Sequence, residues 1–401
     1  MKIAVIGGGA SGLVAAGSAK GAEVVIFERT DKLGKKLYIT GKGRCNFTNV
    51  CDSQTFLSNV VTNASFLRSA LSKFSPDDAV RLINENGCKT KIERGRRGFP
   101  QSDKASDVIK ALRKYAENNN ARIELHAEID QIIPDDNGLI LRHAGGSETF
   151  DRVIICTGGM SYPQTGSDGR AYNIIRALGH NIIAPVPSLV GLILKEDISS
   201  AQGLTLKNIT VRTDGIKPIF GDMMITDNGI SGPIILTLSA YAARKQTPYT
   251  VYIDFKPAMT TDELDARLVR DFSDRLNKQF KNALDDLLPQ AMIKHVVARS
   301  GIGAARQVNS VTKSERRALA ELIKNFSLNV TGSEGFERAV ITSGGVDVRT
   351  VNPKTMESRI VKGLYFGGEA IDVDALTGGY NLQIAFATGY VAGTSAAQAD
   401  D

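Results

Sequence analysis

The feature that most constrains the fold is a glycine-rich turn directly after the first apolar segment. Lys2–Ile6 has the pattern of a short buried strand, residues 7–12 read Gly-Gly-Gly-Ala-Ser-Gly, and a helical pattern follows. In this GxGxxG arrangement Gly7 permits a tight turn, Gly9 lets the backbone approach a pyrophosphate, and Gly12 allows close helix packing. The helix N-terminus also offers unpaired N–H groups to an anion. The sequence therefore predicts a Rossmann-type fold that binds a dinucleotide.

A second strand and a terminal acid strengthen this prediction. Residues 23–27 read as a buried strand that ends in Glu28, at the spacing where a carboxylate accepts hydrogen bonds from the adenosine ribose. An acid at this position disfavours a 2′-phosphate. A lone GxGxxG is weak evidence, but strand, turn, helix, strand and acid stand here in the expected order.

Length and composition indicate a folded protein of more than one domain. Hydrophobic residues make up 42% of the chain and charged residues 23%, which is ordinary for globular proteins. A chain of 401 residues is too long for one small core. No apolar run approaches the roughly 18 residues of a membrane helix, so we expect no membrane association.

Cysteine and histidine are scarce. Four of each occur, and the cysteines form no CxxC pair, so we expect no metal site. Few cysteines in a long chain also argue against a disulfide framework and favour a reducing compartment, for which the cytoplasm is the default.

Later segments decide between NAD and FAD, because the fingerprint serves either cofactor. Residues 152–156 read as a strand that runs into Thr157-Gly158-Gly159, although an ordinary strand end would look similar. Residues 363–366 read as another strand, followed by Gly367-Gly368-Glu369 and then by Gly378-Gly379-Tyr380-Asn381 and a helix. This return of the chain suits FAD, whose length requires contacts from adenine to the isoalloxazine ring.

Two residues of the returning segment have expected roles at the flavin. A glutamate after a strand-end glycine, here Glu369, can accept hydrogen bonds from ribityl hydroxyls. A helix that begins near Tyr380 would direct its positive end at the flavin N1–C2=O edge and stabilise reduced anionic flavin.

Further short motifs are spread over the whole chain. They are Gly34-Lys35-Lys36, the run from Thr40 to Asn49 that contains Gly43-Arg44-Cys45-Asn46-Phe47-Thr48-Asn49, Phe99-Pro100-Gln101-Ser102, Gly229-Ile230-Ser231-Gly232-Pro233, Gly344-Gly345-Val346 and Thr355-Met356-Glu357-Ser358. With these motifs the chain resembles, end to end, the bacterial flavoproteins called the HI0933-like or YhiN-type family. The run around Arg44 and Asn46 is the most specific of them.

This resemblance implies an α/β fold: a Rossmann-like FAD-binding domain of glutathione-reductase type, interrupted by an insert. We expect the FAD domain at residues 1–186 and 343–401 and the insert at 187–342. The insert would be β-barrel-like at about 187–257 and mainly helical at about 258–342. The residue pattern agrees, with short strands around Thr210, Phe220 and Tyr252 and helices from near Thr261.

The loop Gly41-Lys42-Gly43-Arg44 is glycine-rich and basic, so it is suited to phosphate or flavin oxygens, with Arg44 as the charged contact. Asn46 and Thr48 could bind the flavin pyrimidine side or merely satisfy loop backbone groups. Together the residues predicted to bind FAD are Gly7, Gly9, Ala10, Ser11, Gly12, Glu28, Arg29, Lys36, Gly43, Arg44, Asn46, Thr48, Ile129, Thr157, Gly158, Gly159, Gly368, Glu369, Gly379, Tyr380 and Asn381.

Cys45 and Cys51 lie near the place where flavin disulfide reductases carry a redox-active CxxxxC. Five residues separate them instead of four, which on a helix turns the second thiol away from the first. A single reactive thiol at Cys45 is the better alternative, because Arg44 and Lys42 are near. Cys88 and Cys156 are expected to be buried.

The catalytic group is less clearly marked. No Ser/His/Asp or paired-carboxylate constellation can be assembled, and the four histidines lie outside the glycine-rich segments, where we expect structural roles. Tyr162 and Tyr380 follow glycine turns, so either phenol could donate a proton to a reduced substrate, or both could be packing residues.

Three classes of function remain. The chain has no second GxGxxG, so NAD(P)H would bind only transiently, and we favour reduction of an unsaturated or carbonyl small molecule. The resemblance also allows a flavin oxidase of a small amine or aminoketone that uses O2. A net charge of +6 and the cluster at residues 94–97 suggest an FAD-dependent tRNA-modifying protein, but aromatic interleaving is lacking, so nucleic acid is not the expected partner. A flavin-bearing module without turnover also stays open.

Overall fold

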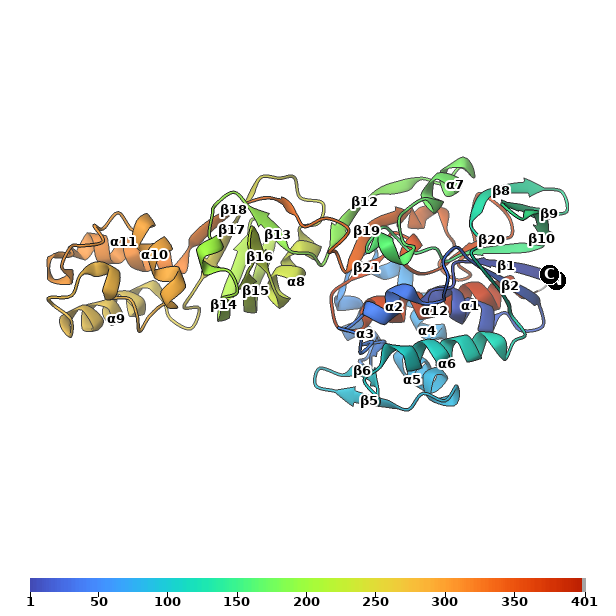
Figure 1. The fold of residues 1–401 in the computed structure, drawn as a ribbon, viewed down its shortest axis with the longest axis horizontal. Helices are drawn as coiled ribbons and strands as arrows, with labels where there is room; N and C mark the ends of the chain where they lie inside the picture. Colours follow the sequence, from blue (N-terminus) through green and yellow to red (C-terminus); the bar gives the residue numbers. More distant parts are fainter. Residues whose placement is uncertain (399–401) are drawn as a thin grey trace. The chain divides into compact units, whose positions relative to one another are not determined.

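The computed structural model describes residues 1–398 of the chain. They form two compact units, one from residues 1–188 and 336–398 and the other from Leu189–Gly335 (Figure 1). The first unit therefore contains both ends of the sequence. Each unit has its own buried apolar core.

The first unit is built on a five-stranded parallel sheet. Its order is β20 (Leu364–Phe366), β11 (Arg152–Ile155), β1 (Lys2–Ile6), β2 (Glu23–Glu28) and β7 (Arg122–Leu125). The last residue of β1, Ile6, lies opposite Ile155 and Phe27, and Ile155 lies opposite Phe366. The carboxyl ends of four strands therefore meet at one edge, which is where α/β sheets bind ligands.

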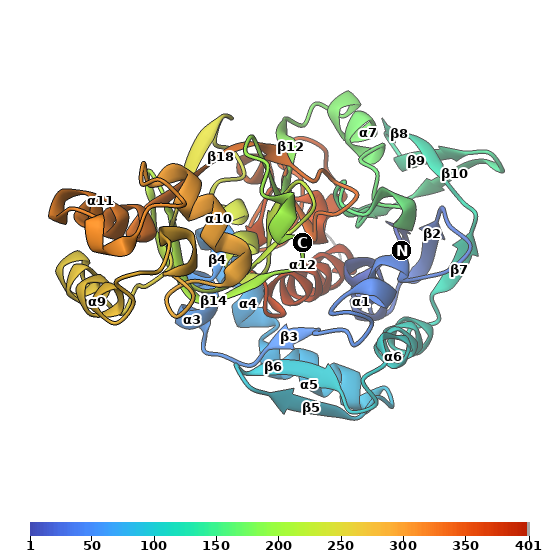
Figure 2. The ribbon, with the colours of Figure 1, turned by 60° about the vertical axis from the view of Figure 1, so that its left-hand side comes forward.

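Two helices from opposite ends of the chain pack backbone to backbone in this unit: α1 (Ala10–Ser18) and α12 (Tyr380–Ala396) (Figure 2). A Cβ atom on Gly389 would lie 2.4 Å from the carbonyl oxygen of Ser11, and one on Gly393 would lie 2.2 Å from that of Ala15. Only glycine fits at these positions. Remaining helices of the unit are α2 (Lys35–Ile39), α3 (Ser53–Ser58), α4 (Arg68–Lys73), α5 (Pro76–Glu85), α6 (Ala105–Glu117) and α7 (Ala171–Ala177).

Small antiparallel sheets complete the first unit. They are β10 (Gly146–Phe150) with β9 (Gly138–His143) and β8 (Ile129–Asp135); β3 (Thr48–Asn49) with β6 (Arg97–Pro100) and β5 (Thr90–Glu93); β21 (Asp374–Ala375) with β4 (Val60–Thr62); and β12 (Ile182–Ser188) with β19 (Ile341–Val346). In the last pair Pro187 lies opposite Thr342. Both domain boundaries expected from the sequence, at 186/187 and 342/343, fall inside this pair of strands.

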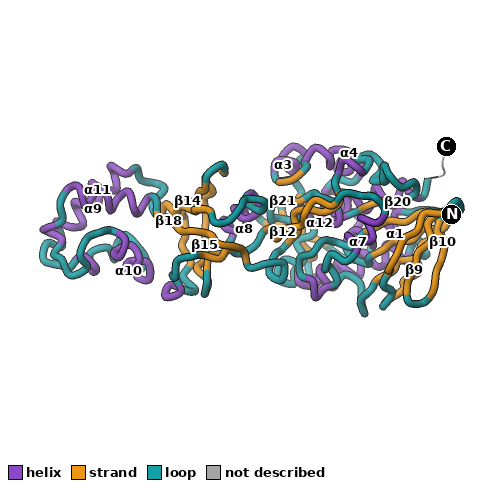
Figure 3. Tube along the Cα trace, turned by 90° about the horizontal axis from the view of Figure 1, so that it is seen from above, coloured by secondary structure: helices purple, strands orange, loops and turns teal. Residues whose placement is uncertain are grey.

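The second unit combines a barrel with a group of helices (Figure 3). The closed barrel has the order β13 (Leu192–Leu194), β16 (Gly229–Ser231), β15 (Ile216–Ile225), β14 (Thr205–Thr213), β17 (Tyr249–Asp254) and β18 (Phe326–Ser333). The helices are α8 (Pro233–Tyr241), α9 (Thr261–Ser273), α10 (Gln290–Arg299) and α11 (Lys313–Lys324). Capping boxes at Thr260 and Thr312 start α9 and α11. The predicted α/β class with a barrel-containing insert is confirmed.

The contact between α1 and α12 can be tested by adding one methyl group. We expect Gly393→Ala to lower the free energy of unfolding of the first unit by about 1–3 kcal/mol, because the new Cβ would overlap the Ala15 carbonyl. Chemical denaturation followed by circular dichroism measures the change. Gly332→Ala is the control, since no atom lies within 4 Å of its Cβ position. Equal effects of both variants would contradict the packing argument.

Candidate cofactor site

The first glycine turn has the geometry of a dinucleotide-binding loop. Gly7 has φ +105° and donates its N–H to the carbonyl of Phe27 at 2.8 Å. A Cβ on Gly12 would lie 1.9 Å from the Gly7 oxygen, whereas one on Gly9 would meet no atom within 4 Å. Helix α1 begins at the next residue without a side-chain cap. The loop thus leaves open space beside Gly9 and uncapped N–H groups at the helix start.

Glu28 holds this turn from the end of β2. Its Oε2 accepts a hydrogen bond from the N–H of Gly8 at 2.9 Å, and its Oε1 accepts one from Thr30 at 2.8 Å. A carboxylate has further lone pairs, so it can still receive a ribose hydroxyl. Arg29, the next residue, pairs instead with Asp168 at 2.9 Å.

A second cluster forms around Glu369, directly after β20. Its carboxylate accepts hydrogen bonds from Lys36 Nζ at 2.8 Å, from Ser161 Oγ at 2.8 Å and from the N–H of Thr342 at 2.9 Å. Gly159 faces the same group, because a Cβ there would lie 2.9 Å from Glu369 Oε1. The structure thus brings together three predicted residues, Lys36, Gly159 and Glu369.

Charge compensation keeps Glu369 ionised. Burial raises the pKa of this carboxyl, but the positive charge of Lys36 and the hydrogen bonds from Ser161 and Thr342 outweigh burial, so the pKa lies below its usual value. The side chains of Lys36 and Glu369 keep 26% and 21% of their surface exposed. That remaining surface is available to a ligand.

Ser161 and Thr342 are site residues that sequence reasoning missed. Thr342 Oγ1 accepts hydrogen bonds from the N–H groups of Met160 at 2.7 Å and Ser161 at 3.1 Å. It therefore fixes the segment that follows Thr157-Gly158-Gly159. Ser161 lies two positions after a predicted glycine, which is a usable signal, but nothing in the sequence around Thr342 marks its role.

The basic loop after α2, residues 41–45, is fixed by contacts with other side chains of the protein. Gly41, Lys42, Gly43 and Cys45 all have positive φ, so the loop is tightly wound. Arg44 pairs with Asp103 and Glu93, which raise its pKa, and its guanidinium lies 4.3 Å from the centre of the Phe99 ring. Contact of Arg44 with FAD therefore stays a prediction, since two carboxylates already engage it.

Asn46, Thr48 and Gly379 lie side by side. A Cβ on Gly379 would lie 2.3 Å from the carbonyl oxygen of Thr48 and 2.9 Å from Asn46 Oδ1. The hydroxyl of Thr48 donates to Gln383 Oε1 at 2.7 Å inside the protein, whereas Asn46 Oδ1 is buried without a hydrogen-bond partner among the described residues. Asn46 is thus better placed than Thr48 to receive a ligand group.

Asn381 has a structural role beside this group. Its Oδ1 accepts from the N–H of Ala375 at 2.9 Å and its Nδ2 donates to the Ala375 oxygen at 2.7 Å. It fixes the turn that leads into α12, which begins at Tyr380 with Gly379 as an uncapped N-cap residue. The second helix terminus of the site is therefore also open.

These groups fit FAD. Three buried side-chain oxygens on or beside the predicted segments have no hydrogen-bond partner within residues 1–398: Asn46 Oδ1, Thr157 Oγ1 and Ser167 Oγ. Unpartnered buried polar atoms are rare in folded proteins, and a ligand that carries hydroxyl, amide and ring N–H groups would satisfy them. The open N-terminus of α1 suits the pyrophosphate. Ile129, predicted as a further contact, is buried at the start of β8.

The two candidate tyrosines lie in different surroundings. Tyr162 is half-buried with φ +52° and donates its N–H to the Phe336 oxygen. Tyr380 is 8% exposed and packs edge-on against Phe56, with ring centres 5.1 Å apart. Burial, together with Cys51, raises the pKa of the Tyr380 phenol. A proton-donor role for either tyrosine stays a prediction.

Three of the four thiols are buried, and none is in a disulfide. All four cysteines are free, and burial raises the pKa of Cys45 to about 12, the opposite of what a reactive thiol needs. The reactive-thiol alternative for Cys45 is therefore wrong, because Arg44 turns to carboxylates instead of the thiol. Cys88 and Cys156 are buried as predicted.

Neither a metal cluster nor a membrane helix is found in residues 1–398. No group of three or more His, Cys, Asp or Glu side chains there could hold a metal ion. Within the same residues, every helix is too short or too polar to cross a bilayer.

Thiol labelling tests the burial of Cys45. At pH 8 we expect at most one of the four thiols, the half-buried Cys51, to react with Ellman's reagent in the native protein, and all four to react in denaturant. Cys51→Ser should then abolish native labelling. Rapid labelling that persists in Cys51→Ser would show that Cys45 is accessible.

Removing the Glu28 carboxylate tests the adenosine end of the site. We expect Glu28→Ala to weaken FAD binding at least roughly tenfold, because both the ribose acceptor and the hydrogen bonds to Gly8 and Thr30 are lost. Flavin absorbance after dialysis and reconstitution measures the effect. Glu23→Ala, at the exposed opposite end of the same strand, is the control. Full flavin retention by Glu28→Ala would remove Glu28 from the site.

Comparison with known proteins agrees with this geometry. The family described as HI0933-like protein Rossmann domain matches residues 1–395. A 3-dehydro-bile acid delta(4,6)-reductase from Clostridium scindens is 32% identical over 99% of both chains. A ribosomal RNA dihydrouridine synthase from Haemophilus influenzae is 30% identical over 98% of this chain and 97% of its own.

Among solved structures, the 3-ketosteroid-delta4-(5alpha)-dehydrogenase from Rhodococcus jostii RHA1 shares the fold. Its TM-score is 0.52 at 15% identity, over 99% of this chain and 96% of that one. With the dinucleotide turn, the returning C-terminal segment and the family match together, the chain belongs to the HI0933-like family of FAD-dependent oxidoreductases.

Proposed function

We propose that this protein is a reductase that saturates a carbon–carbon double bond conjugated with a carbonyl group, with electrons from NAD(P)H and FAD as the carrier. The observation that carries the proposal is the chemistry shared by two full-length relatives. One name denotes reduction of an unsaturated 3-oxo steroid ring and the other formation of dihydrouridine from uridine. Both reactions add two electrons and two protons to a double bond next to a carbonyl.

Different residues of the site would bind different parts of FAD. Gly9 and the start of α1 would receive the pyrophosphate, and Glu28 the adenosine ribose. Glu369 and Lys36 offer an acceptor and a donor to the ribityl hydroxyls. When bound, FAD supplies two-electron transfer between a donor and an acceptor.

A proton donor is also needed, because the reduced substrate carbon must be protonated. We assign this role to Tyr162 or Tyr380. A tyrosine phenol is protonated at neutral pH and can donate its proton, but burial raises the pKa of Tyr380 and makes it a weaker acid than usual. The packing of its ring against Phe56 favours a structural role for Tyr380 over a proton-donor role.

NAD(P)H, the electron donor, would bind only while it transfers its electrons to FAD. The chain has a single GxGxxG, at residues 7–12, and the structure has no second Rossmann sheet within residues 1–398. NAD(P)H would therefore bind without a Rossmann domain of its own and leave after the transfer.

Anaerobic spectroscopy tests the reaction. We expect NADH or NADPH to bleach the flavin absorbance, and an enone such as a 3-oxo-Δ4-steroid to restore it faster than a saturated ketone of the same skeleton. Stopped-flow absorbance at the flavin band measures both steps. Reduction by an amine with rapid reoxidation by O2, and no response to enones, would replace the proposal by the oxidase alternative.

An RNA uridine is a second candidate substrate. It is favoured by the dihydrouridine synthase relative and by three exposed arginines: Arg94 and Arg96 in the turn after β5, and Arg97 at the start of β6. The same assay, with a uridine-containing ribosomal RNA fragment as acceptor, distinguishes it. Faster reoxidation by the RNA than by any enone would move the substrate from small molecules to RNA.

A further inference from the structure

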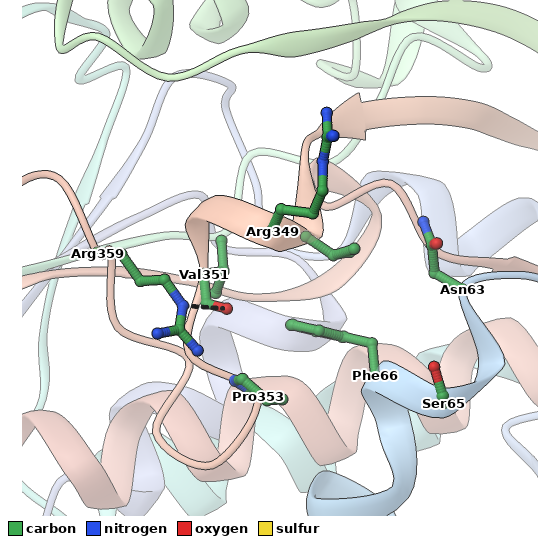
Figure 4. Close-up of a pocket in the computed structure, with 8 residues that line it drawn as sticks. Asn63, Ser65, Phe66, Arg349, Val351, Pro353 and Arg359 are labelled. Carbon is green, nitrogen blue, oxygen red and sulfur yellow. Dashed lines mark hydrogen bonds between the residues drawn. The ribbon is translucent and has the colours of Figure 1, made fainter.

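An open pocket of about 500 Å³ lies on the first unit, and no residue of the glycine turns lines it (Figure 4). Its lining comes from two segments: the turn and 3-10 helix at residues 63–66, and residues 348–359. None of the residues predicted from the sequence lines it. The volume is in the range of small-ligand sites, roughly 300–1,000 Å³.

One cation in this pocket lacks a carboxylate partner. Arg359 donates from Nε to the Val351 carbonyl at 3.4 Å, and within residues 1–398 no acidic side chain forms an ion pair with it. Figure 4 shows its guanidinium beside Val351 and Pro353 and facing Phe66. Arg349 differs, because it is paired with Asp347 and points away from the centre. Arg359 is therefore the group that can receive an anion, by two parallel hydrogen bonds.

The rest of the lining suits a flat ring with polar edges. Phe66 and Pro353 form the apolar part of the lining that a ligand can touch, because Val351 is fully buried. Asn63 uses its Nδ2 on Asp372, at 2.7 Å to the carbonyl and 3.2 Å to the carboxylate, so its Oδ1 remains as an acceptor. The Ser65 hydroxyl is exposed at the rim. An acceptor, a hydroxyl, apolar walls and one guanidinium together match a nucleobase that carries a phosphate.

Hydrogen bonds within the protein hold this wall in place. Residues 351–358 form a tight hairpin, in which Asn352 and Glu357 are joined by a backbone hydrogen bond of 2.8 Å. Ser358 is fixed by His180, whose Nε2 lies 2.8 Å from the Ser358 hydroxyl. A rigid wall reduces the entropy lost on binding.

We propose that this pocket is a binding site for a nucleoside phosphate, with Arg359 on the phosphate. Two kinds of ligand carry such a nucleoside phosphate. One is the adenosine 2′-phosphate end of NADPH, an assignment that rests on the proposed function, and the other is a nucleotide of an RNA chain. Three acids lie on the neighbouring segments, and each has a partner: Asp347 pairs with Arg349, Asp372 accepts from Asn63, and Glu357 accepts from the N–H of Gly363.

Calorimetric titration of the FAD-saturated full chain tests the site, because excess FAD fills the dinucleotide turn. The probes are adenosine 2′-monophosphate, uridine 5′-monophosphate, inorganic phosphate and cholate. We expect at least one nucleotide to bind more tightly than phosphate or cholate. Preference for the 2′-phosphate indicates the NADPH source, and preference for the uridine nucleotide indicates RNA.

Substitutions test whether the nucleotide binds at Arg359. We expect Arg359→Gln to weaken nucleotide binding at least roughly tenfold, with Arg359→Lys intermediate because it keeps the charge but not the planar fork. Lys354→Gln removes one charge from the same hairpin outside the lining and should change binding less than twofold. The flavin spectrum and thermal unfolding report whether each variant is folded.

Two results would overturn the site: equal nucleotide affinity of Arg359→Gln and the unchanged chain, or phosphate or cholate binding as tightly as either nucleotide. Because no turnover is measured, either result leaves the reductase proposal intact. Conversely, failure of the enone assay leaves nucleotide binding at Arg359 unaffected.

Discussion

The close approach of α1 and α12 is the constraint on which the cofactor site depends. These helices come from opposite ends of the chain, and their backbones meet where Gly389 and Gly393 have no side chain. The same return places β20 beside β11, so that Glu369 follows a strand end in the sheet that carries the Gly7 turn. A dinucleotide as long as FAD needs contacts at both places. Loss of this packing would therefore separate the two halves of the site, even if each glycine motif stayed intact.

Electrostatics then fixes the loops that the sheet brings together. Glu369 receives hydrogen bonds from α2, from the segment after β11 and from β19, so one carboxylate joins three parts of the sequence. Such a group is costly to bury without partners, and its partners offset that cost. Its charge is matched by Lys36, which leaves the pair nearly neutral. A neutral pair can offer a hydrogen-bond acceptor and a donor to hydroxyl groups of FAD, and it adds little net charge to the field that acts on the FAD pyrophosphate.

Sequence patterns predict the parts of this site whose requirement is local. Gly7, Gly12 and Gly379 are needed because the backbone there adopts positive φ or meets another backbone, and such needs leave a glycine in the sequence. Contacts between distant side chains leave no such signal. Arg44 was expected to face an anionic ligand, but Glu93 and Asp103, far along the chain, engage it. Thr342 and the pocket at Arg359 were missed for the same reason, since only the fold brings their partners near.

The place where the second unit leaves and rejoins the first explains how an insert of this size is tolerated. β12 and β19 are paired strands of the first unit, with Pro187 opposite Thr342, so the chain departs and returns at neighbouring positions. The first unit is therefore closed by its own hydrogen bonds whatever lies between these strands. Thr342 stands on β19 and also binds the Met160 and Glu369 segments. Changes within the insert can thus leave intact the contacts that β19 makes at the base of the cofactor site.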